Sequence, residues 1–351
     1  MHVWNKTPHI VCIGGGTGLH AELSGLKEGL PEAQLSAIVT MMDSGSNSGK
    51  LRDEFGYLPP GDVRQCLVAL SDAPHELRAL MQHRFLPSDA SGTQSSLHGH
   101  VVGNILLTAF KDITGDEYAA IEAMERTLRI KGKVYPVTLT NSNIVVRLAD
   151  GKEIRGEGNL YDEHRDLSQP IAAIALDPPA QLFEKTREVL ESADYIIIGP
   201  GGLHHSILPN LIVDGMQEAL RSAKENGARI ILVTNTMTKH GDTTGFSAND
   251  MLRRVQEALE GVGIDAVIAN TGAFSPDRLA AYALENAAPV TMDLEDSHSL
   301  LVIGDDLVTD ESFLKHGKPC FARHDPVKLS RAVRRAIDRL SMRDVLSDNA
   351  M

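Results

Sequence analysis

The stretch His9–Asp43, HIVCIGGGTGLHAELSGLKEGLPEAQLSAIVTMMD, decides the fold. It begins with an apolar run over 9–13 that stops at a glycine-rich turn over 14–18, and leucines at helical spacing follow. A second apolar run, over 35–42, ends at Asp43. A strand, a glycine turn, a helix and another strand in this order predict the β-α-β unit of a parallel sheet covered by helices.

The same alternation returns in the second half of the chain. Apolar runs predict strands, and amphipathic stretches predict the helices that connect them. The predicted strands are 195–198, 229–234, 266–269 and 300–303, and the predicted helices are 207–224, 248–259, 276–284 and 327–340. With the N-terminal unit they predict an α/β fold, a Rossmann-like, doubly wound, mostly parallel sheet.

The region between these halves has a different pattern. Four helical patterns lie within 63–128, and residues 133–158 alternate like an antiparallel meander around an Asp150–Gly151 turn. We therefore expect a Rossmann-like nucleotide-binding core, a helical plus antiparallel-β insertion and a tail. The predicted core is 1–62 and 166–340, the insertion is 63–165, and the tail is 341–351.

The composition is that of a globular protein. Hydrophobic residues make up 42% and charged residues 23%, which excludes disordered and fibrous chains. Only 4% of the residues are aromatic and the net charge is −13, so we expect no nucleic acid as a partner. The three cysteines, Cys12, Cys66 and Cys320, form no CxxC pair, and no apolar stretch reaches about 18 residues. We expect a cytoplasmic protein without a membrane span.

Glycine, aspartate or asparagine follows five of the predicted strands. These positions are the turn 14–18, Asp43, the turn 199–202, Asn235 and Asn270. Each one alone is ordinary turn chemistry. Parallel strands, however, bring all five to one edge of the sheet, where open α/β sheets bind their ligands. The first turn offers main-chain N–H groups and a helix N-terminus, which suit a phosphate or diphosphate.

Other site types are disfavoured by spacing. A nicotinamide-dinucleotide turn needs a third glycine where Leu19 stands. The loop GSNSGKL at 45–51 has three residues, not four, between its glycines and Leu51 where Walker A has Ser or Thr. The histidine pairs 98/100 and 204/205 lack the spacing and cysteine partners of zinc sites.

Asp43 has three possible roles. It lies 25 residues after Gly18, near the distance of about 20 expected for a carboxylate that binds a ribose. It could also hold Mg²⁺ beside a diphosphate, or cap the turn that follows it. The residues alone leave these roles open.

Longer motifs carry a resemblance. They are IVCIGGGTGL, SGKLRDEFGYLPPGDVRQCLVALSD, GNILLTAF, YIIIGPGGLHHSILPNLIVDGM and NTMTKHGDTTGFSANDML. In this order, from about residue 9 to about residue 330, they resemble the YvcK family of gluconeogenesis factors, which forms one superfamily with CofD, the 2-phospho-L-lactate transferase. The resemblance implies a Rossmann-like fold and a nucleotide ligand, a UDP-sugar in the YvcK branch, with a role in growth and cell shape on gluconeogenic carbon sources.

The resemblance also implies roles for single residues. The two glycine turns fall on phosphate-facing loops, Asp43 on an acidic position that supports a metal, Tyr282 on the tyrosine of the UDP-sugar site and Arg323 on its arginine. A ring can stack on uracil or sugar, and a guanidinium can hold a diphosphate bidentately. The full candidate set is Gly14, Gly15, Gly16, Thr17, Gly18, Asp43, Asn104, Gly199, Gly201, Gly202, Ser206, Asn235, Asn270, Tyr282 and Arg323.

The chain departs from the family pattern at three places. Ser44 replaces a second Asp, Val101 or Val102 replaces a Ser before GNI, and His204–His205 replaces a common Tyr-Thr pair. The base or sugar preference could therefore differ. We expect a nucleotide-sugar-binding protein and a homo-oligomer. The alternative is a Mg²⁺-dependent, CofD-like transferase that moves a phospholactyl group onto a deazaflavin alcohol, so catalysis is left open.

Overall fold

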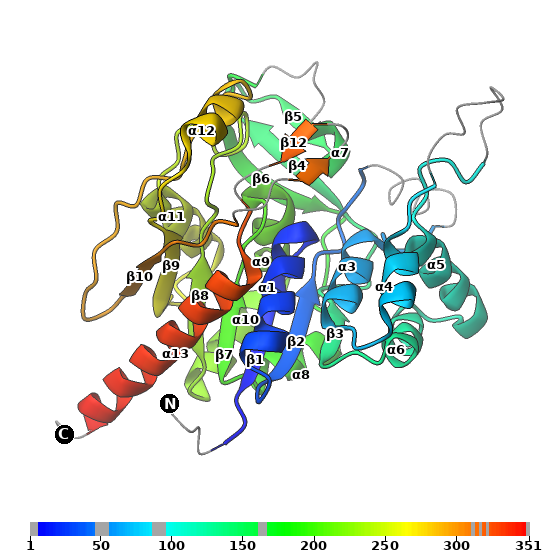
Figure 1. Ribbon diagram of the computed structural model, residues 1–351, viewed down its shortest axis with the longest axis horizontal. Coiled ribbons are helices and arrows are strands. Elements are labelled where there is room, and N and C mark those ends of the chain that lie inside the picture. The colour runs from blue at the N-terminus through cyan, green and yellow to red at the C-terminus, as the bar shows by residue number, and fades with distance from the viewer. Residues whose placement is uncertain are drawn as a thin grey trace.

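The structure is a computed structural model that describes residues 6–45, 56–85, 96–160, 167–309 and 323–348, with two short strands at 313–315 and 318–320. Its centre is a seven-stranded sheet in the order β10-β9-β8-β7-β1-β2-β3 (Figure 1). Every neighbouring pair in this sheet is parallel. The predicted α/β class is confirmed.

The elements follow the predicted alternation over most of the chain. The strands are β1 (His9–Gly14), β2 (Gln34–Val39), β3 (Lys133–Pro136), β4 (Asn143–Leu148), β5 (Glu153–Arg155), β6 (Ile171–Asp177), β7 (Tyr195–Ile198), β8 (Arg229–Val233), β9 (Ala266–Asn270), β10 (Leu301–Asp305), β11 (Phe313–Lys315) and β12 (Lys318–Cys320). The helices are α1 (Gly16–Gly29), α3 (Gly61–Leu70), α4 (His75–Gln82), α5 (Val102–Thr114), α6 (Glu117–Leu128), α7 (Glu157–Leu160), α8 (Glu184–Glu191), α9 (Leu208–Leu211), α10 (Met216–Glu225), α11 (Ala248–Ala258), α12 (Pro276–Ala283) and α13 (Pro326–Asp348).

The strand order reverses between β1 and β7. From β1 the chain moves outward through β2 and β3, and from β7 it moves the other way through β8, β9 and β10. Because parallel crossovers are right-handed, helices on the two sides of such a reversal cover opposite faces of the sheet. The carboxyl ends of β1 and β7 therefore flank a topological switch point, where ligands of this fold class bind.

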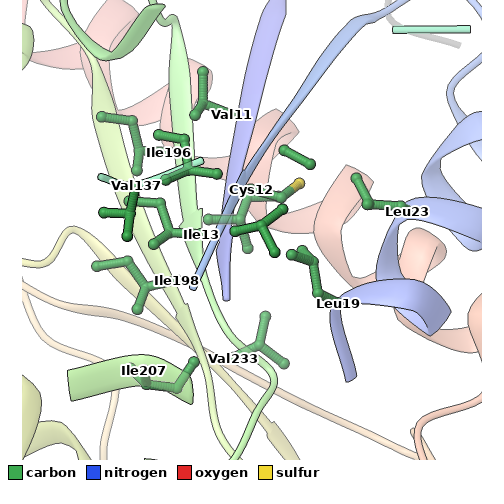
Figure 2. Close-up of a cluster of buried hydrophobic side chains, with 14 of the residues drawn as sticks. Val11, Cys12, Ile13, Leu19, Leu23, Val137, Ile196, Ile198, Ile207 and Val233 are labelled. Atoms are coloured by element: carbon green, nitrogen blue, oxygen red, sulfur yellow. The ribbon is translucent and has the colours of Figure 1, made fainter. Parts of the chain in front are cut away.

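The core forms because the central strands are apolar on both faces. Figure 2 shows Val11 and Ile13 of β1 beside Ile196 and Ile198 of β7, with Leu19 of α1 close by. All five side chains are fully buried. Two-faced burial explains why these strands read as continuous apolar runs rather than alternating ones.

One strand assignment is wrong. Residues 133–136 were expected in an antiparallel meander, but as β3 they pair in parallel with β2, Ser36 opposite Lys133 and Val39 opposite Pro136. β3 is thus the edge strand of the main sheet. Its four residues are half-buried in alternation, because an edge strand covered on one side produces the same pattern as a meander.

The antiparallel sheet predicted around Asp150–Gly151 does exist, with a different third strand. β4 pairs antiparallel with β5, as expected, and on its other side with β6. β6 lies within 166–340, the range expected to belong to the core. The three-stranded sheet β5-β4-β6 therefore contains strands from both sides of the domain boundary predicted at residue 165.

Two helix predictions are also wrong in extent. The helix expected over 207–224 is broken into α9 and α10 at Gly215, whose φ of +92° no helix can contain. The C-terminal helix was expected to end at residue 340, but α13 continues to Asp348. Most of the predicted tail is therefore helical.

Helix α13 lies along α1 in very close contact (Figure 1). A Cβ atom added at Gly25 of α1 would overlap the carbonyl oxygen of Pro326, and one at Gly29 would lie 2.5 Å from Ser330 Oγ. These two glycines, one helical turn apart, allow α13 to approach. Within the described residues no helix is both long and apolar enough to cross a bilayer.

Candidate functional site

A cleft of about 570 Å³ lies at the switch point, over the carboxyl ends of the central strands. Eleven of the predicted residues line it, namely Gly15, Gly16, Thr17, Gly18, Asp43, Gly201, Gly202, Ser206, Asn235, Tyr282 and Arg323. The two glycine turns are neighbours because β1 and β7 pair directly. The cleft is of the size of ordinary small-molecule sites.

The first glycine turn opens into the cleft at the start of α1. Gly15 is the N-cap and supplies no side chain to the helix, whose first turn carries no acidic residue. Gly16 has a φ of +60°, a conformation that L side chains rarely adopt. The orphan N–H groups and the positive end of the helix dipole therefore point toward the cleft.

The second glycine turn touches the first. A Cβ atom at Gly18 would overlap the carbonyl oxygen of Pro200, so the backbone at residue 200 occupies the space that any side chain at 18 would need. Gly199 has a φ of +81°, and a Cβ there would lie 2.7 Å from Val233 O. Both turns are fixed by contacts that only glycine permits.

Asn210 connects the first glycine turn to the segment that follows the second. Its Nδ2 donates to Gly14 O at 3.0 Å and to Ser206 O at 2.7 Å, and the side chain is fully buried. Sequence reasoning missed this residue. The sequence does contain an indication of its role. Asn210 is a polar residue in the apolar segment ILPNL, and a buried amide needs hydrogen-bond partners.

One wall of the cleft is acidic. Asp43 follows β2 and accepts a hydrogen bond from Gly45 N at 2.8 Å. Glu157 of α7 approaches the same face of Gly45, where a Cβ would be 2.6 Å from Glu157 Oε2 and 3.5 Å from Asp43 Oδ1. Asp43 and Glu157 line the cleft together with Asp62 of α3.

Asp62 faces the N-terminus of α1. Burial, together with the charges of Asp43 and Glu157, raises the pKa of Asp62 to about 7, although the hydrogen bond from the Gly16 N–H acts in the opposite direction. At neutral pH this carboxyl is therefore close to half protonated. Sequence reasoning quoted the PPGD segment that contains Asp62 but assigned it no role.

The lining residues that come from the other side of the switch point include a guanidinium, and we call this part of the cleft the opposite wall. His205 of the π-helical turn η1 (Leu203–Ile207), Tyr282 of α12 and Arg323 line it, together with His324. His324 donates its Nε2–H to Thr234 O at 3.1 Å, and burial lowers the pKa of His324 to about 4. His324 is therefore neutral at physiological pH, which leaves Arg323 as the permanent cation of this wall.

Four predicted residues do not line the cleft. Gly14 and Gly199 form the backbone that supports the turns. Asn104 is buried and accepts from Arg64 Nε at 2.8 Å. Asn270 is buried as well, and its Oδ1 accepts from Leu307 N at 2.9 Å while its Nδ2 donates to Gly272 O. Both amides are satisfied by the protein.

The loop at 45–51 that resembles a P-loop lies mostly outside the described residues. Among the residues that the structure describes, no three His, Cys, Asp or Glu side chains are arranged to hold a metal ion. A cation at the acidic wall would therefore need oxygen atoms from a bound ligand and from water to complete its coordination.

Comparisons with known proteins identify the family. The chain matches the family described as 2-phospho-L-lactate transferase CofD over residues 10–308. It is 39% identical over 332 residues to a Nostoc sp. protein named "Putative gluconeogenesis factor", a match that covers 93% of this chain and 68% of that protein. It is 37% identical to the gluconeogenesis factor of Halalkalibacterium halodurans, with 93% and 96% covered. The crystal structure of a UPF0052 family member from Bacillus halodurans, 34% identical, has a TM-score of 0.81, with 93% of this chain and 99% of that one covered. The chain belongs to the CofD family, in its group of gluconeogenesis factors.

Proposed function

We propose that this chain is a nucleotide-sugar-binding protein of carbon metabolism, with a UDP-sugar as the ligand of the cleft. The observation that carries the proposal is the contact between the two glycine turns at the switch point, beside the N-terminus of α1, where Gly15 supplies no capping side chain and the Gly16 N–H donates to Asp62. Main-chain N–H groups in this arrangement suit a diphosphate.

The opposite wall supports the same ligand class. Arg323 offers a guanidinium that binds phosphate oxygens in pairs, and Tyr282 offers an aromatic face for a base or sugar ring. Proteins from Halalkalibacterium halodurans and Bacillus subtilis that resemble this chain carry the name gluconeogenesis factor. We extend to this chain a role in growth and cell-shape maintenance on gluconeogenic carbon sources.

Thermal and urea unfolding in the presence of UDP-N-acetylglucosamine, UDP-glucose and GDP tests the proposal. A ligand at 100 times its Kd should raise the free energy of unfolding by about 2.7 kcal/mol. Tyr282→Ala should weaken UDP-sugar binding about tenfold, whereas Tyr282→Phe, which keeps the ring, should bind normally. Stabilisation by GDP but by neither UDP-sugar contradicts the proposal.

A second candidate function rests on the acidic wall. Phosphates would meet three carboxylates there, and Mg²⁺ held by Asp43 and Glu157 would offset that repulsion and the charge that develops on a transferred phosphoryl group. This favours the transferase activity that names the family. Incubation with a deazaflavin alcohol and a guanine-nucleotide phospholactyl donor should then give product, and Asp43→Asn should abolish it while UDP-sugar binding is retained. Absence of product with the unaltered protein and Mg²⁺ rejects this candidate.

A further inference from the structure

A buried carboxylate connects two consecutive histidines beside the second glycine turn. Asp242 Oδ1 lies 2.5 Å from His204 Nδ1, and Asp242 Oδ2 lies 3.8 Å from His205 Nδ1. The side chains of Asp242 and His204 are 2% and 1% exposed, whereas that of His205 is 22% exposed and lines the cleft. The proposed nucleotide site assigns no task to this group.

The backbone brings these three residues together for a local reason. His204 and His205 lie in η1, a π-helical turn, and such turns are rare and frequently lie at functional sites. Asp242 comes from the loop after β8, where its N–H donates to Lys239 O at 3.1 Å. The carboxylate therefore reaches both rings from a separate element.

Gly202 makes room for the His205 ring. A Cβ atom at position 202 would overlap the imidazole at its Cε1. The backbone of Gly202, with φ −64° and ψ 125°, is one that any residue adopts. Glycine is needed at position 202 because any side chain there would displace the imidazole, and not because of the backbone conformation.

Carboxylates lie on both sides of His205, behind the ring and in the cleft before it. Burial raises the pKa of Asp242, but the hydrogen bond from His204 and the charges of His204, His205 and Lys239 outweigh burial and hold that pKa well below its usual range. Asp242 is thus ionised behind the ring. Across the cleft lie Asp43, Asp62 and Glu157, and on the same wall lie Arg323 and the neutral His324.

We propose that His205 binds the diphosphate of the ligand in this cleft. As an imidazolium, it donates its Nε2–H to a diphosphate oxygen. The Asp242 carboxylate, which His204 holds in place, faces the Nδ1–H of His205. This inference rests on the proposed nucleotide site and names the residue that gives that site its pH dependence. Asp242 is a positioning residue, because it acts through His205. Ligand affinity should fall as the pH rises and His205 loses its proton.

The test is calorimetric titration with UDP-N-acetylglucosamine from pH 5.5 to 8.5, because its diphosphate diester keeps its charge over this range. Asp62 also titrates near the cleft, so all variants are made in the Asp62→Asn background. In that background His205→Gln should lose about tenfold in affinity at pH 6 and show a flat pH profile. His298→Gln, at an exposed histidine, is the matched control and should leave the profile unchanged.

A second readout separates positioning from simple packing. In nuclear magnetic resonance titrations, Asp242→Asn should lower the pKa of the His205 ring, and bound ligand should raise it in the parent protein. Should Asp242→Asn not fold, Gly202→Ala serves instead, because it displaces the ring and should reproduce the tenfold loss. If UDP-N-acetylglucosamine does not bind at any pH, the proposed function fails. If it binds and His205→Gln leaves affinity and pH profile unchanged, only the present inference is overturned.

Discussion

The two walls of the cleft differ in charge although they rise from the same sheet. The acidic wall holds Asp43, Asp62 and Glu157, and the opposite wall holds His205 and Arg323. For the proposed diphosphate-bearing ligand, we expect this difference in charge to fix its direction, because the carboxylates repel phosphate unless a cation is present. The acidic wall can then serve a bound Mg²⁺ or the hydroxyl groups of a sugar.

The largest effect should come from separating the two glycine turns that lie between the walls. Gly18→Ala places a methyl group against the immobile carbonyl of Pro200. Alanine normally favours a helix by about 1 kcal/mol over glycine, yet we expect a net loss of about 3 kcal/mol in the free energy of unfolding, because overpacking a backbone contact costs more.

Urea unfolding measures this loss, and Gly263→Ala is its control. A Cβ at Gly263 has no neighbour closer than Lys224 Nζ at 3.9 Å, so the control should change stability by less than about 0.5 kcal/mol. If Gly18→Ala is as stable as the control, the two glycine turns are not held in contact, and the described geometry of the cleft is wrong.

The second prediction concerns Arg323, the permanent cation of the opposite wall. Arg323→Ala should weaken UDP-sugar binding about 10- to 100-fold, since a charge-assisted bidentate contact contributes about 1.5–3 kcal/mol. Arg323→Lys should recover part of the affinity, because it keeps the charge and loses the fork. Arg331→Ala, an exposed residue of α13, should bind like the unaltered protein in the same calorimetric titration.

The smallest effect concerns stability at the acidic wall. The pKa of Asp62 is raised in the folded state, so the native protein binds its proton more tightly than the unfolded chain, and stability falls as the pH rises from about 4 to about 7. Asp62→Asn should flatten this slope and stabilise the protein at pH 8. Because Asp62 borders the open cleft, we expect about 1–2 kcal/mol rather than the roughly 4 kcal/mol of a fully enclosed group.

Thermal unfolding at pH 4.5 and pH 8 checks this prediction. The control is Glu225→Gln at the exposed end of α10, which should have no effect at either pH. A variant Asp62→Asn that is less stable than the parent at pH 8 would mean that the ionised carboxylate stabilises α1, and the view of a repelling acidic wall would be wrong.

The first part of the fold was predictable because its signals are local. The unit from β1 to β2 is specified by an apolar run, a glycine turn and helical leucine spacing within 9–43. β3 was misassigned because its partner, β2, lies about a hundred residues earlier, and four alternating residues do not distinguish an edge strand from a meander. The break at Gly215 was readable from the glycine alone, but the apolar run around it favoured one helix.

The site residues also differ in whether the sequence alone could predict them. Residues at strand ends, such as Thr17 and Asn235, reach the cleft because strand direction alone places them there. Glu157 arrives through the contact of α7 with the segment after β2, where Gly158 N donates to Ser44 Oγ at 3.3 Å, and nothing near residue 157 predicts that. Asn104 and Asn270 were expected in the cleft because polarity does not reveal whether a side chain already has a protein partner.

The contact between α1 and α13 has a consequence for how the protein matures. Arg323 lies just before α13, and the glycines that let α13 settle on α1 belong to the helix whose first turn opens the cleft. During synthesis the chain emerges from its N-terminus, so the two glycine turns can form while α13 is still inside the ribosome. The cleft gains its guanidinium only when α13 docks, so a nascent or clipped chain lacking that helix should be folded in its centre and yet unable to retain its ligand.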